Sequence, residues 1–597
     1  MLATVAQTSA LARGCDELHA ELLAAEGVIE VRRVGTAEWI ELARGDVVCM
    51  GDSVRAQAFS RATLRLPDQS VIRLDQHSTL TLDEPDDGAG SLLRLIRGVI
   101  HVISRDPRSL RFSTPHVNAG LKGTEFDIRV DEAEGETAIA VLEGTVEVTN
   151  AAGRVDVPSG FVATAHAGEM PAQTPIAEPI DLMRWASYFQ PILDGPLPDP
   201  DQEAPPALAN DPQWLATRGA ARLQHGDLAA AEADFAAAAT NAPGDATVLA
   251  LRAIAALGRN DIATARTLAH AATNASASSV PAKIALSHVQ QADGDLSGAL
   301  ASAGAALARE PDNAIAWARR AELELGLGDS SQSLESARHA IGLRSSFGYA
   351  HSVLGFVLLS RLDIGGAIAA FERASALDQG SPLPQLGLAL ALIQRGDLLA
   401  GRQHLEVAVA LDPSNAIMRS YMAKTYDAEH RTTLPGTQLD LAKRFDPADP
   451  TPWLYDALVK LSRNRPVEAL DDLLTATDRN DNRAPLRSRL ALDADLATRS
   501  AGTGHVLREV GFGQLALVGG WSATTLDPAD YAAHRLLADV YSTEPRHELV
   551  RVSELLTSQL LQPANLTPIQ PQLGQVGSLH ADRGGPTELA FTEFTPL

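Results

Sequence analysis

Two patterns of apolar and polar residues divide the chain. Between Gly27 and Gly168, apolar residues alternate with polar ones in short runs, as at Leu64 and Leu66, and turn sequences such as Pro85-Asp86-Asp87-Gly88 separate the runs. This alternation predicts β-strands arranged as a sandwich, a roll or a β-helix-like barrel. From residue 212 onward, two apolar stretches with helical spacing recur in each repeat unit. We therefore predict a multidomain chain, with an N-terminal all-β module followed by an all-α solenoid.

A period of 34 residues organises the helical region. Frames that start at residues 212, 246, 280, 314, 348, 382, 416 and 450 follow one another without slippage, so eight units cover 212–483. The eighth position is always Gly, Ala or Ser, which predicts close helix crossings. Glycines between the two apolar stretches suit a turn with positive φ, so each unit is predicted to be a helical hairpin. The twenty-seventh position is alanine in every frame: Ala238, Ala272, Ala306, Ala340, Ala374, Ala408, Ala442 and Ala476.

This arrangement resembles the tetratricopeptide repeat family. The frame at 348 also matches the family pattern, although Leu362 replaces the turn glycine. The resemblance implies a right-handed superhelix of hairpins that binds proteins or peptides. In the frame at 416, we expect His430 and Pro435 to deform the second helix. Two degenerate hairpins are predicted over 484–563, the last of them a cap. The first frame shows the family pattern most clearly, in Gly219, Gly226, Ala231, Phe235, Ala238 and Pro243.

Motifs of the β-module, which we place at 21–170, resemble the FecR family of envelope regulators. The resemblance implies an extracytoplasmic domain that relays the status of a ligand or transporter to a sigma factor. The family's usual membrane helix and cytoplasmic arm are not seen in this sequence, which weighs against direct sigma-factor signalling. The motif residues Gly123, Thr124, Glu125 and Phe126 are expected to be structural. The similar segments are 51–55, 68–74, 114–115, 123–126 and 142–146.

Residues 171–211 form a proline-rich, acidic linker with an aromatic patch. We expect its residues Trp185, Tyr188 and Phe189 to dock onto the β-module or the first hairpin, and a partner-binding motif is the alternative. The leader, 1–20, lacks the apolar run of a signal peptide, so we expect export to depend on residues upstream of Met1. The tail, 564–597, is interpreted as a disordered segment or as an unpaired β-segment that pairs with another polypeptide.

Charge and motif content exclude several functions. The net charge of −25 repels nucleic acid, and no apolar run is long enough to span a membrane. The sixteen histidines show no metal-ligand spacing, and His101 is expected to be a surface or packed residue. Nucleotide-binding and hydrolase motifs are not found, so we predict no catalytic, cofactor or metal site and no enzymatic activity. Cys15 and Cys49 are too few for a disulfide framework.

The first helix of each hairpin is expected to line the concave side of the solenoid. Ala216 and Ala220 occupy the sites where some relatives clamp a peptide carboxylate, so an extended or helical peptide with apolar anchors is favoured. The candidate partner groove consists of Tyr349, Ser352, Phe356, Leu359, Leu386, Leu390, Leu454 and Leu458. Packing between helices is the alternative interpretation of these groove residues.

We expect a non-enzymatic cell-envelope scaffold or sensor. Its solenoid would bind a protein or peptide, and its β-module would bind an envelope ligand, a polymer such as a polysaccharide, or a transporter component. An extracytoplasmic regulator of sigma-factor type is the alternative, and a glycan-processing enzyme is the weakest option.

Overall fold

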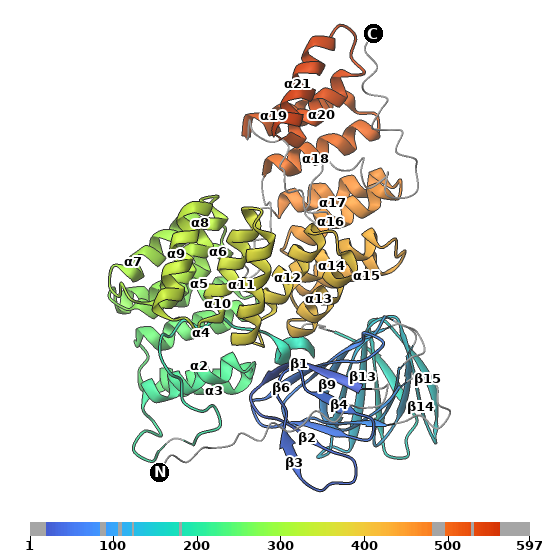
Figure 1. The fold of residues 1–597 in the computed structure, drawn as a ribbon, viewed down its shortest axis with the longest axis vertical. Helices are drawn as coiled ribbons and strands as arrows, with labels where there is room; N and C mark the ends of the chain where they lie inside the picture. Colours follow the sequence, from blue (N-terminus) through green and yellow to red (C-terminus); the bar gives the residue numbers. More distant parts are fainter. Residues whose placement is uncertain are drawn as a thin grey trace, which may run out of the picture. The chain divides into compact units, whose positions relative to one another are not determined.

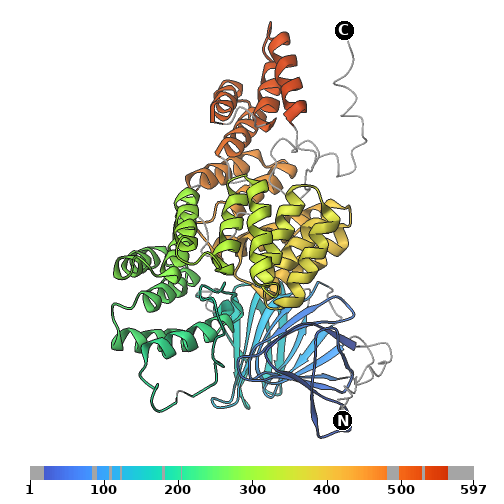
Figure 2. The same ribbon diagram turned by 60° about the vertical axis from the view of Figure 1, so that its left-hand side comes forward.

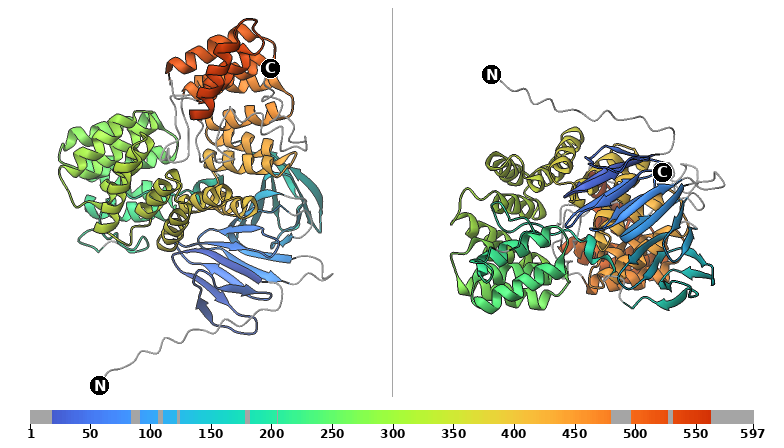
Figure 3. Two further views of the ribbon diagram at one scale, coloured as in Figure 1. Left: turned by 45° about the horizontal axis from the view of Figure 1, so that its top comes forward. Right: turned by 90° about the horizontal axis from the view of Figure 1, so that it is seen from below.

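The computed structural model describes residues 19–83, 91–105, 110–121, 124–177, 182–203, 205–479, 496–526 and 531–561. The chain divides into two compact units, Met1–Ala186 and Ser187–Leu597 (Figure 1). The first unit contains the strands, coloured blue to teal, and the short 3-10 helix η1 (Arg184–Ala186) (Figure 3). The second unit contains the α-helices. The predicted order of an all-β region followed by an all-α region is therefore confirmed.

The strands of the first unit form two ladders that share β9 (Ser91–Ile103). One ladder runs β4 (Val47–Cys49), β1 (His19–Glu26), β6 (Arg61–Arg65), β7 (Val71–Leu74), β9, β12 (Glu125–Asp131), β13 (Glu136–Glu143), β16 (Phe161–His166), β17 (Ala172–Pro175). The other runs β3 (Trp39–Glu41), β2 (Ile29–Arg32), β5 (Ser53–Ala56), β8 (Thr79–Asp83), β9, β10 (Leu110–Ser113), β11 (Asn118–Leu121), β14 (Thr145–Asn150), β15 (Gly153–Pro158).

Gly98 lies where β9 passes from one ladder to the other. Residues before it pair with β8 and β10, and the residues from Gly98 to Ile103 pair with β12. Gly98 has a φ of 94°, and a side chain at this position would overlap Ser78. The close approach and the positive φ both require glycine here. One hydrophobic core includes residues of both ladders, among them Leu64 and Leu80.

The helices of the second unit follow one another as antiparallel pairs, from green to red in Figure 2. The first helices of the eight predicted frames are α2 (Pro212–Gln224), α4 (Ala246–Gly258), α6 (Val280–Ala292), α8 (Ala314–Gly326), α10 (Gly348–Ser360), α12 (Pro382–Gln394), α14 (Ala416–Ala428) and α16 (Thr451–Ser462). The second helices are α3 (Leu228–Asn241), α5 (Ile262–Ala275), α7 (Leu296–Leu307), α9 (Ser330–Leu343), α11 (Ile364–Leu377), α13 (Leu398–Leu411), α15 (Leu434–Phe445) and α17 (Pro466–Asp478).

The helix boundaries follow the 34-residue period. Seven of the eight frames begin at the first residue of a helix, and α16 begins one residue into its frame. The alanine at the twenty-seventh position is fully buried in all eight units. In seven units its carbonyl also accepts a hydrogen bond from the backbone N–H of the residue that caps the second helix. Each alanine therefore lies at a close contact near the end of its hairpin.

The frame at 416 departs from the others less than the sequence suggests. Pro435 is the second residue of α15, where its missing N–H leaves no hydrogen bond broken, and His430 lies in the turn with a φ of 60°. The second helix of this hairpin starts two positions late instead of being interrupted.

Two further helix pairs follow the eight frames: α18 (Leu496–Glu509) with α19 (Gly513–Leu526), and α20 (Tyr531–Tyr541) with α21 (Glu548–Leu561). Leu549 and Leu560 of α21 are 88% and 86% exposed, in contrast to the polar outer face expected of a capping repeat. The predicted tail at 564–597 and most of the leader lie outside the described residues.

Candidate peptide-binding site

The predicted groove residues lie within the packing of the solenoid. All eight are buried, and Leu359 is the most exposed of them at 9%. The ring of Phe356 packs edge-to-face against Phe371, with centroids 4.9 Å apart. Leu454 and Leu458 belong to a hydrophobic cluster that extends to α17 and α18. Their contacts with other helices match the alternative interpretation, packing between helices, and their role in partner binding stays a prediction.

A buried polar network connects the first helices of three consecutive hairpins. Arg319 of α8 donates to Glu322 at 2.6 Å and to the hydroxyl of Ser287 of α6 at 2.8 Å. The hydroxyl of Tyr349 of α10 also donates to Glu322. Burial raises the pKa of Tyr349 well above its usual value, and Glu322 raises it further. Tyr349 therefore stays a neutral hydrogen-bond donor inside the solenoid.

The aromatic patch docks onto the solenoid at Tyr188 and Phe189. The hydroxyl of Tyr188 donates to Oδ2 of Asp378, after α11, at 2.7 Å. Burial raises the pKa of Tyr188 well above its usual value. Asp378 raises this pKa further, and Tyr349 adds to the rise. The buried ring of Phe189 lies directly over Gly258, the last residue of α4.

The predicted docking place on the first hairpin is thus corrected. Phe189 contacts the second hairpin and Tyr188 contacts the end of the fifth. Gly258 leaves the space that the phenyl ring fills, and Asp378 supplies the acceptor for the phenol. Trp185 belongs to the first unit, where its backbone carbonyl accepts from Nη1 of Arg61 at 3.0 Å. Docking of its indole side chain onto the β-module stays a prediction.

The chain after Phe189 continues to contact the solenoid. The carboxylate of Asp194 accepts from Nη1 of Arg344 at 2.7 Å and from the backbone N–H of Ala314, the first residue of α8, at 3.3 Å. The carbonyls of Pro200 and Gln202 accept from two arginines of α2. Residues 187–203, which we call the docked segment, therefore lie against four hairpins.

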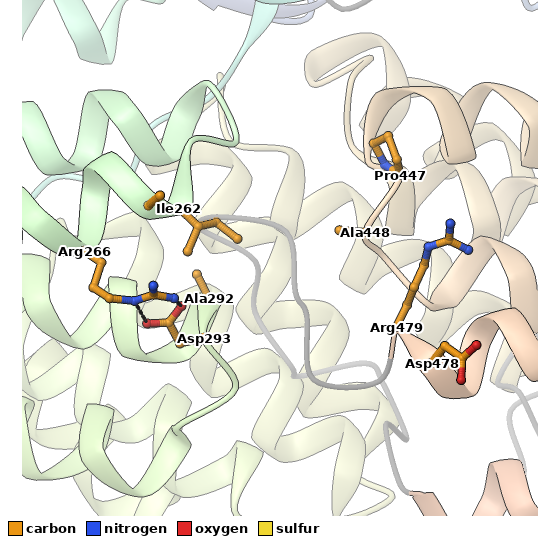
Figure 4. A pocket seen from close by; sticks show the side chains of 9 residues that line it. Ile262, Arg266, Ala292, Asp293, Pro447, Ala448, Asp478 and Arg479 are labelled. Carbon is orange, nitrogen blue, oxygen red and sulfur yellow. Dashed lines mark hydrogen bonds and ion pairs between the residues drawn. The ribbon is translucent and has the colours of Figure 1, made fainter.

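Two parts of the solenoid that are far apart in the sequence also contact each other. The side-chain amide of Asn260, after α4, donates to Asp446, after α15, at 3.3 Å. Beside this contact is a pocket of about 660 Å³ between α5–α6 and the region of α15–α17. Figure 4 shows Arg266 paired with Asp293 on one wall, and Pro447 and Ala448 with Asp478 and Arg479 on the other. Its apolar residues and the Arg266–Asp293 pair make a surface suited to binding.

The FecR-like motif of the β-module lies in its core. Thr124, Glu125 and Phe126 are fully buried, and Gly123 lies outside the described residues. Nε2 of the buried His101 is 3.4 Å from Glu125, and its Nδ1 is 3.2 Å from Asp127. Burial lowers the pKa of His101, but the two carboxylates outweigh it and raise the pKa to about 9. His101 is a packed residue, as predicted, and it is cationic at neutral pH.

Comparison with known families separates the two units. Residues 52–147 match the family model described as FecR protein, and residues 284–346 and 354–416 match that of the tetratricopeptide repeat. The chain carries a FecR domain and tetratricopeptide repeats. No curated protein matches the FecR–tetratricopeptide chain significantly.

Several solved structures are similar to parts of this FecR–tetratricopeptide protein. A chain of the APC/C hetero-tetramer Cut9–Hcn1 is 13% identical, with a TM-score of 0.44 over 62% of this chain and 75% of that one. A tetratricopeptide repeat protein from Parabacteroides merdae is 17% identical, with a TM-score of 0.30 over 39% and 93%. A candidate anti-sigma factor from Parabacteroides distasonis is 13% identical, with a TM-score of 0.19 over 21% and 59%.

The FecR and tetratricopeptide families support a role in protein interaction or regulation, and both are in general non-enzymatic. Among the described residues, no group of three or more His, Cys, Asp or Glu is placed to hold a metal ion. None of the described helices combines the length and apolar character needed to cross a membrane. Cys49, the last residue of β4, is disulfide-bonded, which the sequence did not predict.

Proposed function

We propose that this FecR-domain protein is a non-enzymatic scaffold or sensor of the cell envelope. Its tetratricopeptide solenoid binds a protein or peptide partner, and its FecR domain binds an envelope ligand, a polymer such as a polysaccharide, or a transporter component. The observation that carries the proposal is the docked segment, an extended stretch of chain held by side chains and backbone groups of four hairpins. A surface that accommodates one extended segment has the hydrogen-bonding groups and apolar contacts that suit another.

Two observations support a location in the cell envelope: the FecR match and the disulfide bond of Cys49. Disulfides persist in oxidising compartments and are rare in the cytosol. The test is thiol alkylation in intact cells that express the protein from its own locus, followed by mass spectrometry. We expect Cys49 to be alkylated only after reduction. Alkylation of Cys49 in unreduced samples would contradict the envelope location.

The alternative, an extracytoplasmic regulator of sigma-factor type, is favoured by the FecR match alone. Cross-linking of the tagged full-length protein in cells, with identification of the retained proteins, separates the two functions. A scaffold should retain envelope proteins. Retention of a sigma factor or an anti-sigma helix would favour the regulator, and retention of nothing beyond a tag-only control would contradict both.

A further inference from the structure

The docked segment resembles a bound peptide more than a structural connection. It contains no helix or strand, and its contacts with the solenoid involve side chains and single backbone groups at five separate positions. Gly258 and Asp378, which contact the neighbouring residues Phe189 and Tyr188, are 120 positions apart in the sequence. The segment therefore crosses the space between helices of distant hairpins.

We infer that the docked segment is an intramolecular ligand of the solenoid, and that it occupies the surface a partner peptide of the same chemistry takes. That chemistry is an aromatic pair followed five residues later by an acid, as in Tyr188, Phe189 and Asp194. This inference rests on the proposed function, because it names the class of partner for the same surface. Displacement of the segment by the partner then becomes the step that exposes the surface.

The aromatic pair makes the most specific contacts. Phe189 covers the Cα of Gly258, and a methyl group there would overlap its ring. The missing side chain of Gly258 leaves space for a flat ring against the backbone, so the position suits an aromatic side chain. Tyr188 adds a hydrogen bond from its phenol to a carboxylate, which a phenylalanine cannot make.

The acidic residue supplies charge complementarity. Asp194 pairs with Arg344 and accepts from the backbone N–H of Ala314 at the N-terminus of α8. A guanidinium and the positive end of a helix both favour a carboxylate. An extended peptide that lacks the acid would leave Arg344 without this partner, so the aromatic pair and the acid together define the ligand.

Tethering explains how few contacts suffice. A segment attached to its own binding surface has an effective concentration on the order of 1 mM. If its intrinsic Kd is about 100 μM, the segment occupies the surface most of the time, and it lowers the apparent affinity of a competing peptide about tenfold. Release of the segment should therefore strengthen binding of a free peptide by about that factor.

The experiment uses a fluorescent synthetic peptide with the sequence of residues 187–203, titrated with the full-length protein and followed by anisotropy. The native protein should bind it weakly. In the Phe189→Ala protein, the docked segment binds its own solenoid less tightly, so this protein should bind the free peptide about tenfold more tightly. A peptide carrying the same substitution should not bind. Tyr188→Phe, which removes only one hydrogen bond, should give a smaller gain and decides the question if the first variant does not fold.

A matched pair of glycine variants locates the binding. In the Phe189→Ala protein, adding Gly258→Ala should abolish the gain, because the methyl group overlaps the phenyl ring of the bound peptide. Adding Gly342→Ala in α9 should keep the gain, because a methyl group there meets nothing within 4 Å. Both substitutions replace a helical glycine.

Three results would overturn the inference. The first is that the Phe189→Ala protein, with unchanged helical circular dichroism, binds the peptide no more tightly than the native protein. The second is that a folded Tyr188→Phe protein shows no gain in affinity either. The third is that the gain in affinity of the Phe189→Ala protein survives the added Gly258→Ala substitution. Because the peptide comes from the chain itself, a positive result stands even if no envelope partner is found. A negative result leaves the cross-linking test of the proposed function independent.

Discussion

The alanine at the twenty-seventh position of each repeat offers a direct test of the packing. Ala374 in α11 is fully buried, and its carbonyl accepts from the N–H of Asp378 at 2.9 Å. A Cβ placed on Gly348 of the preceding helix would lie only 3.2 Å from that carbonyl oxygen. Ala374→Leu adds three carbon atoms where the backbones already touch. Overpacking of this kind costs about 1–3 kcal/mol.

Hydrogen exchange of the full-length protein measures this cost locally, which avoids assuming that a multidomain chain unfolds in one step. A loss of about 1–3 kcal/mol should speed amide exchange in α10 and α11 by about 5- to 150-fold. Ala376→Leu is the control, since Ala376 is an exposed residue of the same helix. Unchanged protection in the Ala374→Leu protein would refute the steric role of the alanine, and an equal effect in the control would make it non-specific.

Two further outcomes follow from particular residues. Leu362 has a φ of 66° and is 46% exposed, so Leu362→Gly should relieve left-handed strain and stabilise the α10–α11 hairpin by about 0.5–1 kcal/mol. Slower amide exchange in that hairpin would support this prediction. Faster amide exchange there would contradict it. The folded-state pKa of His101 is raised to about 9, so its stabilisation is complete below the unfolded pKa of about 6.5 and is lost as pH rises through about 9. Exchange protection of β9 and β12, corrected for intrinsic rates, should fall over that range, less so in His101→Gln than in the native protein or in the exposed control His166→Gln.

The sequence predicts the repeats well because their period is set by local chemistry. Helix starts in the first helices often coincide with a side chain that caps the backbone, as Asp211 does for α2 and Asn313 for α8. Pro435 shows the limit of pattern alone, since a proline inside the expected helix position becomes harmless when the helix begins two residues later. The shift depends on how the turn at His430 folds, which no periodicity reveals.

The FecR domain was predictable in class but not in topology. Alternation indicates strands without saying which strands pair, and the sharing of β9 between two ladders depends on the space around Gly98. The buried pairing of His101 with Glu125 and Asp127 joins strands far apart in the sequence. A lone histidine on a strand gives no sign of such partners.

The burial of the predicted groove does not have one cause, and the difference decides which residues a partner search should target. Phe356, Leu454 and Leu458 contact other helices, so they stay in the core of the solenoid whatever the docked segment does. Tyr349 differs, because it lies close enough to Tyr188 to act on its pKa. Release of the docked segment would uncover the groups that now hold it. Substitutions intended to block a partner without unfolding the solenoid belong at these positions, Gly258, Arg344 and Asp378, rather than at the buried leucines.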